Sequence, residues 1–565
     1  MRRALYLALA VLVSQPSPAA AIATEDAVLR AREGAANLLR GKYRDAIASF
    51  DSALKARDLA DARRANILND RGVAKWRLKR PKEAIADFNN SVELFPDYAL
   101  VYNNRGNALL DMGEAEQALL DFTRAIALAP NYGAAFNNRG NALLTLDRKE
   151  EARKDFRKAI QLMPTNAVPF NGRGKVHAAL GRPFAGVRDF SRALNLNAKY
   201  SGARRNRGAA YLELRRDSDA VLDYTELIAQ NPESAEFYFA RGSAYARTRR
   251  YNSAVKDFSK AISLDPDHAA AYRERGAAFL RTKRFKKARA DLAMSLSLDP
   301  GNVSALTKSA NAYLRLGIAE EGLIHADKAL SSEPNNAEAL AARGQIYESL
   351  GRAEDAVTDY KAALAADPLL SSARIRLQKM GVAPPPPPKR ETLGKPVKGW
   401  VISKLPAGHY LATNRRYPKI QVRLEMYGPG EPRIVDWTRM KNSLRGIALL
   451  RYRAGALGDD GAASYDYTAI VDLWKAKVVA VEPHSWGDKK ARWDWKMASV
   501  TVTDPDGIAN EVTLRTAPRD TYGRGNQFWS DDGWWAQGGR PAPRPRRPKP
   551  RRRPPSGGLF DWLFN

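Results

Sequence analysis

A pattern of small, aromatic and proline positions recurs every 34 residues along most of the chain. An aromatic residue usually follows the small residue by four places and a proline by twelve, and a glycine usually precedes it by twelve. This pattern predicts pairs of short helices that pack closely at glycine and alanine, with proline ending the second helix. The small positions are Ala84, Ala118, Ala152, Gly186, Ala220, Ala254, Ala288, Gly322 and Ala356, with a less regular copy at Ala46.

One unit, from Val101 to Pro130, reads VYNNRGNALLDMGEAEQALLDFTRAIALAP. It resembles the tetratricopeptide repeat, in the variant with Asn-Arg-Gly in the first helix. The resemblance covers residues 27 to about 380 in ten copies. It implies a mainly α fold, a right-handed solenoid of about ten helix pairs, whose first helices line a concave groove that binds peptides or protein segments. It also implies a binding protein and not an enzyme.

An arginine stands one place before the repeat glycine, and an aspartate follows that arginine by sixteen places. The two repeats that lack one member lack both, since Ser309 occurs with His325 and Glu33 with Ser49. A guanidinium can bind a carboxylate through two parallel hydrogen bonds, so we predict structural ion pairs across the helix pairs. The predicted pairs are Arg71 with Asp87, Arg105 with Asp121, Arg139 with Asp155, Arg173 with Asp189, Arg207 with Asp223, Arg241 with Asp257, Arg275 with Asp291 and Arg343 with Asp359.

Asparagines gather in the first helices of four consecutive repeats. The positions three before and one after the glycine are four apart, so they share one helical face. An amide both donates and accepts hydrogen bonds, and a row of amides can bind an extended peptide backbone. The alternative is that these side chains cap neighbouring turns or face water. The predicted peptide-binding residues are Asn69, Asn103, Asn104, Asn107, Asn137, Asn138, Asn141 and Asn171.

This row resembles the asparagine ladder in the repeats of the O-linked N-acetylglucosamine transferase. It departs from the carboxylate-clamp repeats, because the lysine expected at the Asn69 type of position is missing, and this argues against recognition of a terminal carboxylate. Later repeats lose the asparagines, so the chemistry of the groove is expected to change along its length. The residues three before the glycine position become Arg205, Phe239, Arg273, Thr307 and Ala341.

The repeat pattern ends in a predicted capping helix over residues 369–380, which a solenoid needs to cover its last repeat. A proline-rich linker is expected over 381–395, because five consecutive prolines favour an extended spacer. Alternating apolar residues from Ile420 to Met426 then predict a strand, with further strand candidates near Trp400, Ile447 and Val478. Residues 396–518 are therefore expected to form a small β-rich domain, and we recognise no family for it.

All of the eleven tryptophans except Trp76 lie from Trp400 onward. Tryptophan faces can stack on sugars, and this leaves a glycan-binding or peptidoglycan-binding, even hydrolytic, β domain as the alternative function. Clustered tryptophans in a small β domain are more often core residues, and this interpretation is favoured. No catalytic constellation or metal-ligand spacing is found in the sequence, and no cofactor is expected.

The N-terminus is typical of a signal peptide over residues 1–23. Arg2 and Arg3 precede an apolar run from Ala4 to Val13, and cleavage after Ala21 or Ala23 fits the small-residue rule. The run is too short to span a bilayer, so an uncleaved anchor is less favoured. The mature protein, with its solenoid at 24–380, is therefore expected in the periplasm or outside the cell.

Lysine and arginine number 92 against 62 acidic residues, so the net charge is +30, and cysteine is absent. The absence of cysteine excludes disulfides and thiolate metal sites. Residues 519–565 are expected to be a disordered tail rich first in glycine and aromatics and then in arginine and proline. Its stretch from Arg540 to Pro555 carries eight positive charges and no acid. In an exported protein this favours anionic lipid headgroups or acidic wall polymer over nucleic acid, with a solubilising tail as the alternative.

Taken together, the sequence predicts an exported scaffold or adaptor. It would hold a peptide or protein segment in its groove and use its C-terminal half for a second contact, in an envelope-associated complex.

Overall fold

A computed structural model describes residues 18–368, 370–386, 392–404, 410–416, 420–424, 431–439, 447–457, 463–473, 477–486, 489–495, 499–503 and 509–513. The apolar run of the predicted signal peptide and the predicted tail 519–565 lie outside these residues. Among the described helices, none combines the length and the apolar character needed to cross a lipid bilayer.

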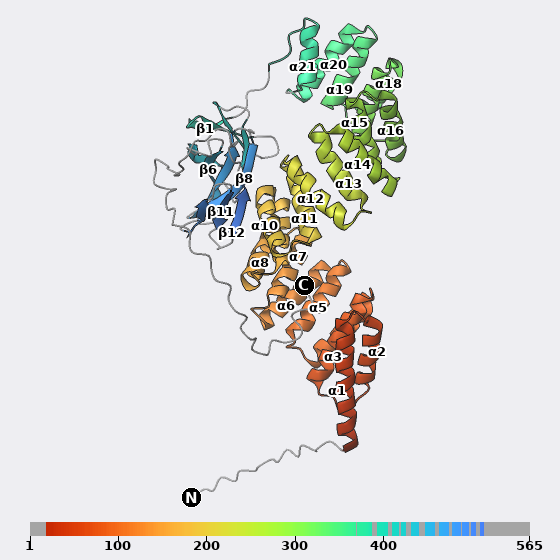
Figure 1. The fold of residues 1–565 in the computed structure, drawn as a ribbon, viewed down its shortest axis with the longest axis vertical. Coiled ribbons are helices and arrows are strands. Elements are labelled where there is room, and N and C mark those ends of the chain that lie inside the picture. Colours follow the sequence, from red (N-terminus) through yellow and green to blue (C-terminus); the bar gives the residue numbers. More distant parts are fainter. Residues whose placement is uncertain are drawn as a thin grey trace, which may run out of the picture. The chain divides into compact units, whose positions relative to one another are not determined.

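The described helices are drawn as coiled ribbons in Figure 1. They fall into two compact units, divided between α9 and α10. The odd-numbered helices are the first helices of the repeats and the even-numbered ones the second helices. The first unit contains α1 (Pro18–Leu39), α2 (Tyr43–Leu54), α3 (Asp61–Arg77), α4 (Pro81–Leu94), α5 (Ala99–Asp111), α6 (Ala115–Leu128), α7 (Gly133–Thr145), α8 (Lys149–Leu162) and α9 (Ala167–Ala179).

The second unit continues the same repeat and then becomes a β module. Its helices are α10 (Pro183–Leu196), α11 (Ser201–Glu213), α12 (Asp217–Gln230), α13 (Ala235–Arg247), α14 (Tyr251–Leu264), α15 (Ala269–Arg281), α16 (Phe285–Leu298), α17 (Val303–Arg315), α18 (Ala319–Ser332), α19 (Ala337–Ser349), α20 (Ala353–Ala366) and α21 (Ser371–Lys379). Helix α21 occupies the place predicted for the capping helix, and its Ala373 and Leu377 are buried.

Glycine is required where the two helices of a repeat meet. A Cβ atom at Gly72 would lie only 2.6 Å from the ring of Phe88, and one at Gly106 only 2.7 Å from the ring of Phe122. Both rings are completely buried. The predicted packing of an aromatic side chain against the glycine of the first helix is therefore confirmed, and any larger residue there would have to displace a core ring.

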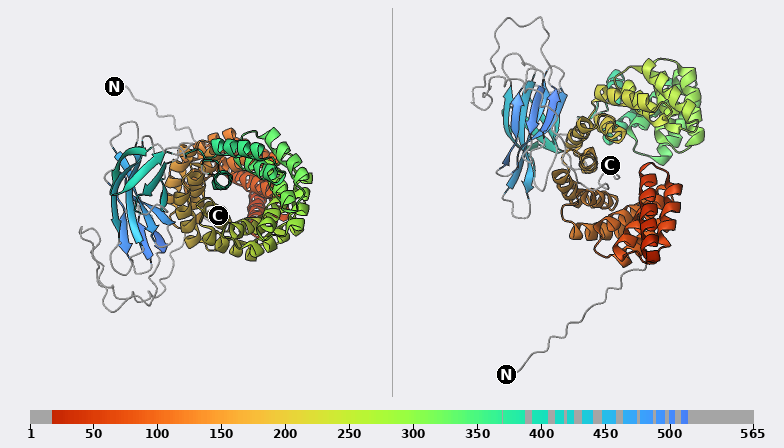
Figure 2. Two further views of the ribbon diagram at one scale, coloured as in Figure 1. Left: turned by 90° about the horizontal axis from the view of Figure 1, so that it is seen from above. Right: turned by 60° about the horizontal axis from the view of Figure 1, so that its bottom comes forward.

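The β module contains β1 (Thr392–Val397), β2 (Trp400–Lys404), β3 (Tyr410–Asn414), β4 (Gln421–Leu424), β5 (Arg433–Arg439), β6 (Ile447–Leu457), β7 (Ala463–Asp472), β8 (Lys477–Trp486), β9 (Lys489–Lys490), β10 (Arg492–Trp495), β11 (Ser499–Thr503) and β12 (Ala509–Thr513). The strands form three antiparallel sheets, β1 to β4, β5 to β9 and β10 to β12, each in chain order. Figure 2 draws the strands of the module as blue and blue-green arrows. The strands predicted near Trp400, Ile420, Ile447 and Val478 are present. Strand pairing is present from Thr392, inside the predicted linker 381–395, where Thr392 pairs with Ser403 of β2.

Four tryptophans of the module, Trp400, Trp437, Trp493 and Trp495, pack against its apolar residues. Trp400 is 1% exposed and meets Trp437 edge to face with ring centroids 4.8 Å apart. Trp493 and Trp495 stack on each other at 5.8 Å and pack against the buried residues of β11 and its neighbours. Trp400 is therefore a core side chain, as the favoured interpretation of the sequence expected, whereas Trp437, Trp493 and Trp495 are partly buried and pack against the core with one face or edge.

Candidate functional site

In seven of the eight predicted arginine–aspartate pairs, both residues belong to the same unit. Each of these arginines is joined to its aspartate by two hydrogen bonds. Arginine Nε donates to one carboxylate oxygen and Nη2 to the other, at 2.6 to 2.9 Å. The eighth pair, Arg173 and Asp189, has one member in each unit. The paired residues are Arg71 with Asp87, Arg105 with Asp121, Arg139 with Asp155, Arg207 with Asp223, Arg241 with Asp257, Arg275 with Asp291 and Arg343 with Asp359.

The third nitrogen of each paired arginine reaches the preceding second helix. Nη1 of Arg105 donates to Asn89 Oδ1 at 2.8 Å, and Nη1 of Arg275 donates to Ser259 Oγ at 3.0 Å. The hydrogen bond to Asp121 raises the pKa of Arg105 above its ordinary value. Each guanidinium therefore connects its own helix to two neighbouring helices. All three of its nitrogens donate a hydrogen bond within the scaffold.

The predicted row of asparagines is largely closed to solvent. Asn69, Asn103 and Asn104 are at most 1% exposed, and Asn137 and Asn171 are also buried. These amides form hydrogen bonds between neighbouring first helices. Asn104 Nδ2 donates to Asn69 Oδ1 at 2.8 Å, and Asn138 Nδ2 donates to Asn103 Oδ1 at 2.9 Å. The prediction that the whole row faces an open groove is therefore wrong for the five buried residues.

Three asparagines of the row are partly exposed: Asn107, Asn138 and Asn141. Asn138 is bonded to Asn137 and Asn103. Asn141 is approached at 3.5 Å by the ammonium group of Lys175. For Asn107 and Asn141, a role in binding a peptide stays a prediction.

A buried carboxyl lies at one end of this row and was not singled out from the sequence. Asp70 accepts a hydrogen bond from Asn69 at 3.1 Å, and burial raises its pKa to about 7. The corresponding residues of the next two repeats, 34 and 68 places later, are Asn104 and Asn138. An acid where the next two repeats have amides was the available clue.

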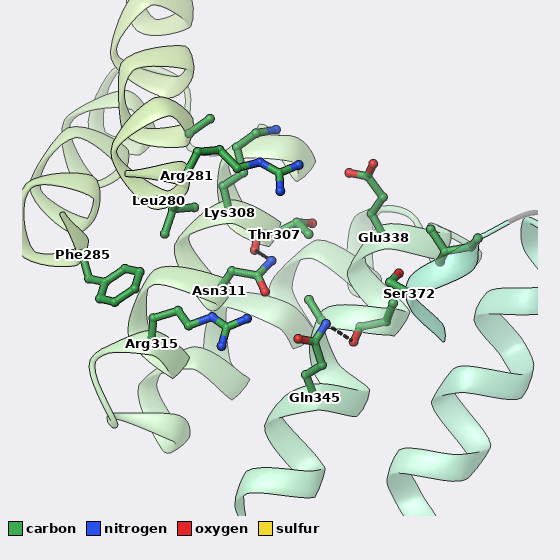
Figure 3. Close-up of a pocket in the computed structure, with 14 residues that line it drawn as sticks. Leu280, Arg281, Phe285, Thr307, Lys308, Asn311, Arg315, Glu338, Gln345 and Ser372 are labelled. Carbon is green, nitrogen blue, oxygen red and sulfur yellow. Dashed lines mark hydrogen bonds between the residues drawn. The ribbon is translucent and has the colours of Figure 1, made fainter. Parts of the chain in front are cut away.

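A cavity of about 470 Å³ opens on the first helices of the second unit (Figure 3). It is lined by residues of α15, α17, α19 and α21 and by Phe285 at the start of α16. Asn311 and Gln345 stand one place after the glycine position of their repeats, as Asn107 and Asn141 do. The pocket therefore lies on the face of the first helices that the sequence predicted to bind a peptide. It lies in the later repeats, where the row of asparagines is absent.

Polar acceptors and cations surround the cavity. The side-chain nitrogens of Asn311 and Gln345 donate to carbonyls of their own helices at 3.0 and 3.2 Å, which leaves the amide oxygens available to a donor (Figure 3). Arg281, Lys308 and Arg315 supply three positive charges, and Glu338 is the one acid among the fourteen lining residues. The site is suited to a ligand that donates through N–H groups and carries negative charge.

The described part of the β module contacts α10 and Arg216, at the start of α12, and contributes no residue to the lining of this cavity. Phe184 and Ala185 of α10 belong to the same buried cluster as Trp400. The guanidinium of Arg188, also on α10, lies 3.7 Å from Glu482 of β8, and Nη1 of Arg216 donates to the carbonyl of Val479 at 2.6 Å. None of the residues that line the cavity comes from the described part of the β module.

Comparisons with known proteins agree with this architecture. A profile of the tetratricopeptide repeat matches residues 39–99, 103–167, 218–255, 239–303 and 307–370. No curated protein matches the chain significantly. Solved structures that match include YrrB, described as a tetratricopeptide repeat protein with an unusual peptide-binding site, at 27% identity over 33% of this chain and 95% of that one, with a TM-score of 0.29.

A tetratricopeptide repeat protein from Parabacteroides merdae is 19% identical over 44% of this chain and 97% of its own, with a TM-score of 0.37. MamA is 23% identical over 28% of this chain and 94% of its own, with a TM-score of 0.27. From the repeat profile and the helix pairs with their glycine–aromatic contacts, the repeat region of this chain belongs to the tetratricopeptide-repeat family.

Proposed function

We propose that this protein is an exported scaffold that holds a peptide or protein segment of a partner on the face formed by its first helices. Tetratricopeptide repeats form scaffolds suited to protein binding and are generally not enzymes. The partner segment would lie across consecutive repeats, and the β module would make a second contact in an envelope-associated complex.

The observation that carries this proposal is the open cavity on α15, α17 and α19. Three consecutive first helices contribute to one cavity, so an extended chain can cross all three and meet the same kind of position in each. The contacts that the β module makes with α10 and Arg216 support it, because among the described residues the module meets the solenoid there and lines no part of the cavity on α15 to α19.

Export is the second part of the proposal and rests on the charged and apolar N-terminus, Arg2 to Val13. Cell fractionation of a bacterium that produces the full chain with a C-terminal epitope tag tests it. The processed chain is expected in the periplasmic or secreted fraction, shortened by about 21 to 23 residues at its N-terminus. A full-length chain retained in the cytoplasm would contradict export without touching the binding proposal.

Site-specific photocrosslinking tests the binding face. A benzoylphenylalanine in place of Gln345, which lines the cavity, is expected to capture partner peptides in the producing cell. The matched control is the same residue in place of Lys361, an exposed side chain on the second helix α20. Equal capture from both positions, or capture from Lys361 alone, would reject the first-helix face as the binding surface.

A further inference from the structure

We propose that the α15–α21 cavity selects extended peptide segments in which an acidic side chain stands beside an apolar one. This inference rests on the proposed function and adds the chemical class of the ligand. It is based on a group of cations that have no acidic partner among the described residues. Beside these cations lie apolar side chains and the amide oxygens of Asn311 and Gln345.

The repeats provide an internal comparison for these cations. Arg247 stands five places after the glycine of its repeat and is bonded to Asp217, the first residue of α12. Arg281 and Arg315 occupy the same position in the next two repeats. The residues that correspond to Asp217 are there Tyr251 and Phe285, so the acid that neutralises Arg247 has been replaced by an aromatic ring.

Arg281 and Arg315 consequently have no acidic partner within 4.0 Å in the part of the chain that the structure describes, and both are exposed. Lys308 donates to the hydroxyl of Ser304 at 2.5 Å and has no acidic partner within 4.0 Å among the described residues. The scaffold arginines differ, because an aspartate of the same repeat binds each of them at two points. The positive charge of Arg281, Arg315 and Lys308 is therefore available to a ligand in the cavity.

The segment that follows Arg281 strengthens this field. Residues 281–289 contain six lysines or arginines and no acid, and most of these side chains are exposed. Such a cluster attracts anionic ligands over roughly a Debye length, about 8 Å at physiological ionic strength. Glu338, on the far wall, is a single opposing charge (Figure 3).

The rest of the lining indicates a peptide as the source of the negative charge. Leu280, Phe285 and Leu370 offer apolar surface beside the cations. The amide oxygens of Asn311 and Gln345 accept hydrogen bonds, which peptide N–H groups supply and phosphate oxygens do not. A peptide with an acidic and an apolar side chain can pair with the cations, contact the apolar side chains and donate its backbone N–H groups to the amide oxygens. A nucleic acid backbone can pair only with the cations.

An array of capped ten-residue peptides, probed with the full-length protein, tests the inference. Bound peptides are expected to be enriched in Asp and Glu and to contain Leu, Ile or Phe. The decisive variant is Phe285→Asp, which supplies Arg315 with the acid that Asp217 supplies to Arg247. It removes no cation, and an acid at the first residue of a helix is favourable, so the variant should fold.

For the tightest array peptide, measured by fluorescence anisotropy, Phe285→Asp is expected to weaken binding about tenfold or more, since a charged hydrogen bond is worth about 1.5–3 kcal/mol. Phe285→Leu, which keeps the apolar wall, should lose much less. Arg247→Ala, which removes the neutralised arginine, should leave binding unchanged. Circular dichroism of each variant verifies that the helices remain.

Three results would overturn the proposal. If peptides bind without enrichment of acids, or if Phe285→Asp binds as wild type does, the inference fails while peptide binding stands. If a single-stranded oligonucleotide of similar charge displaces the peptide and binds more tightly, the cavity recognises negative charge alone and the selection of a peptide is rejected. If no peptide binds the wild-type protein, both the inference and the proposed function are rejected.

Discussion

The polar side chains of the first helices α3, α5 and α7 and those that line the cavity on α15, α17 and α19 differ in their exposure. In the first group, asparagine side chains of neighbouring first helices form hydrogen bonds with one another, and most of them are buried. In the second, equivalent faces surround an open cavity with cations that lack an acidic partner among the described residues. The comparison teaches that the repeat position decides which way a side chain points, and that its neighbours decide whether it is available to a ligand.

The largest expected effect separates paired from unpaired arginines. Arg105→Leu should lower the free energy of unfolding by about 3–5 kcal/mol, because it leaves the carboxylate of Asp121 buried without its partner. Arg315→Leu in the cavity should change it by about 0.5 kcal/mol or less. Urea denaturation of both variants measures the contrast, and the double variant Arg105→Leu with Asp121→Leu should recover much of the loss. Equal effects of the two single variants would break the comparison.

The next effect concerns Asp70 at the end of the closed row. Its pKa of about 7 in the folded protein exceeds the value of about 3.9 expected when unfolded. Between these values the folded state keeps a proton that the unfolded state releases, so this residue makes the protein less stable as pH rises from 4 to 7.

Asp70→Asn should therefore raise the free energy of unfolding at pH 8, by a few kcal/mol at most, and remove part of the decline with pH. The difference between variant and wild type, measured by denaturation at pH 5 and pH 8, isolates this group from the other titrating residues. A difference that stays constant over this range would show that Asp70 is ionised in the folded protein.

A smaller effect distinguishes a closed amide from an open one. Asn104→Ala should cost about 1–3 kcal/mol, because Asn69 loses its donor in a buried site. Asn311→Ala, on the cavity wall, should cost about 0.5 kcal/mol or less. Thermal unfolding of the two variants side by side provides the measurement. If Asn311→Ala were the more destabilising of the two, the distinction between the two regions would be lost.

The smallest effect tests whether the first unit also binds a peptide. Asn107→Ala combined with Asn141→Ala should leave stability unchanged and weaken peptide capture by the full chain about two- to tenfold, the value of one neutral hydrogen bond. Crosslinking yield of the partner in the producing cell measures it, with Asn311→Ala as the reference. Unaltered capture would confine peptide binding to the α15–α21 cavity.

Sequence periodicity by itself determined the contacts that stay inside one repeat. Gly72 meets Phe88, and Arg71 meets Asp87, because sixteen residues of helix, turn and helix bring the same two positions together in every copy. Alternation likewise located β strands near Ile420 and Ile447, since the side-chain period of a strand is two. These are local consequences of helix pitch and strand pleat.

Only the tertiary structure decided the features that depend on how one repeat meets another. The burial of Asn103 follows from its distance to the next first helix, and the freedom of Arg315 follows from Phe285, thirty residues earlier and on a different helix. The contact between Arg216 and Val479 joins residues 263 apart. No period in the chain encodes such contacts, because they depend on the stacking of neighbouring elements and not on the geometry within one of them.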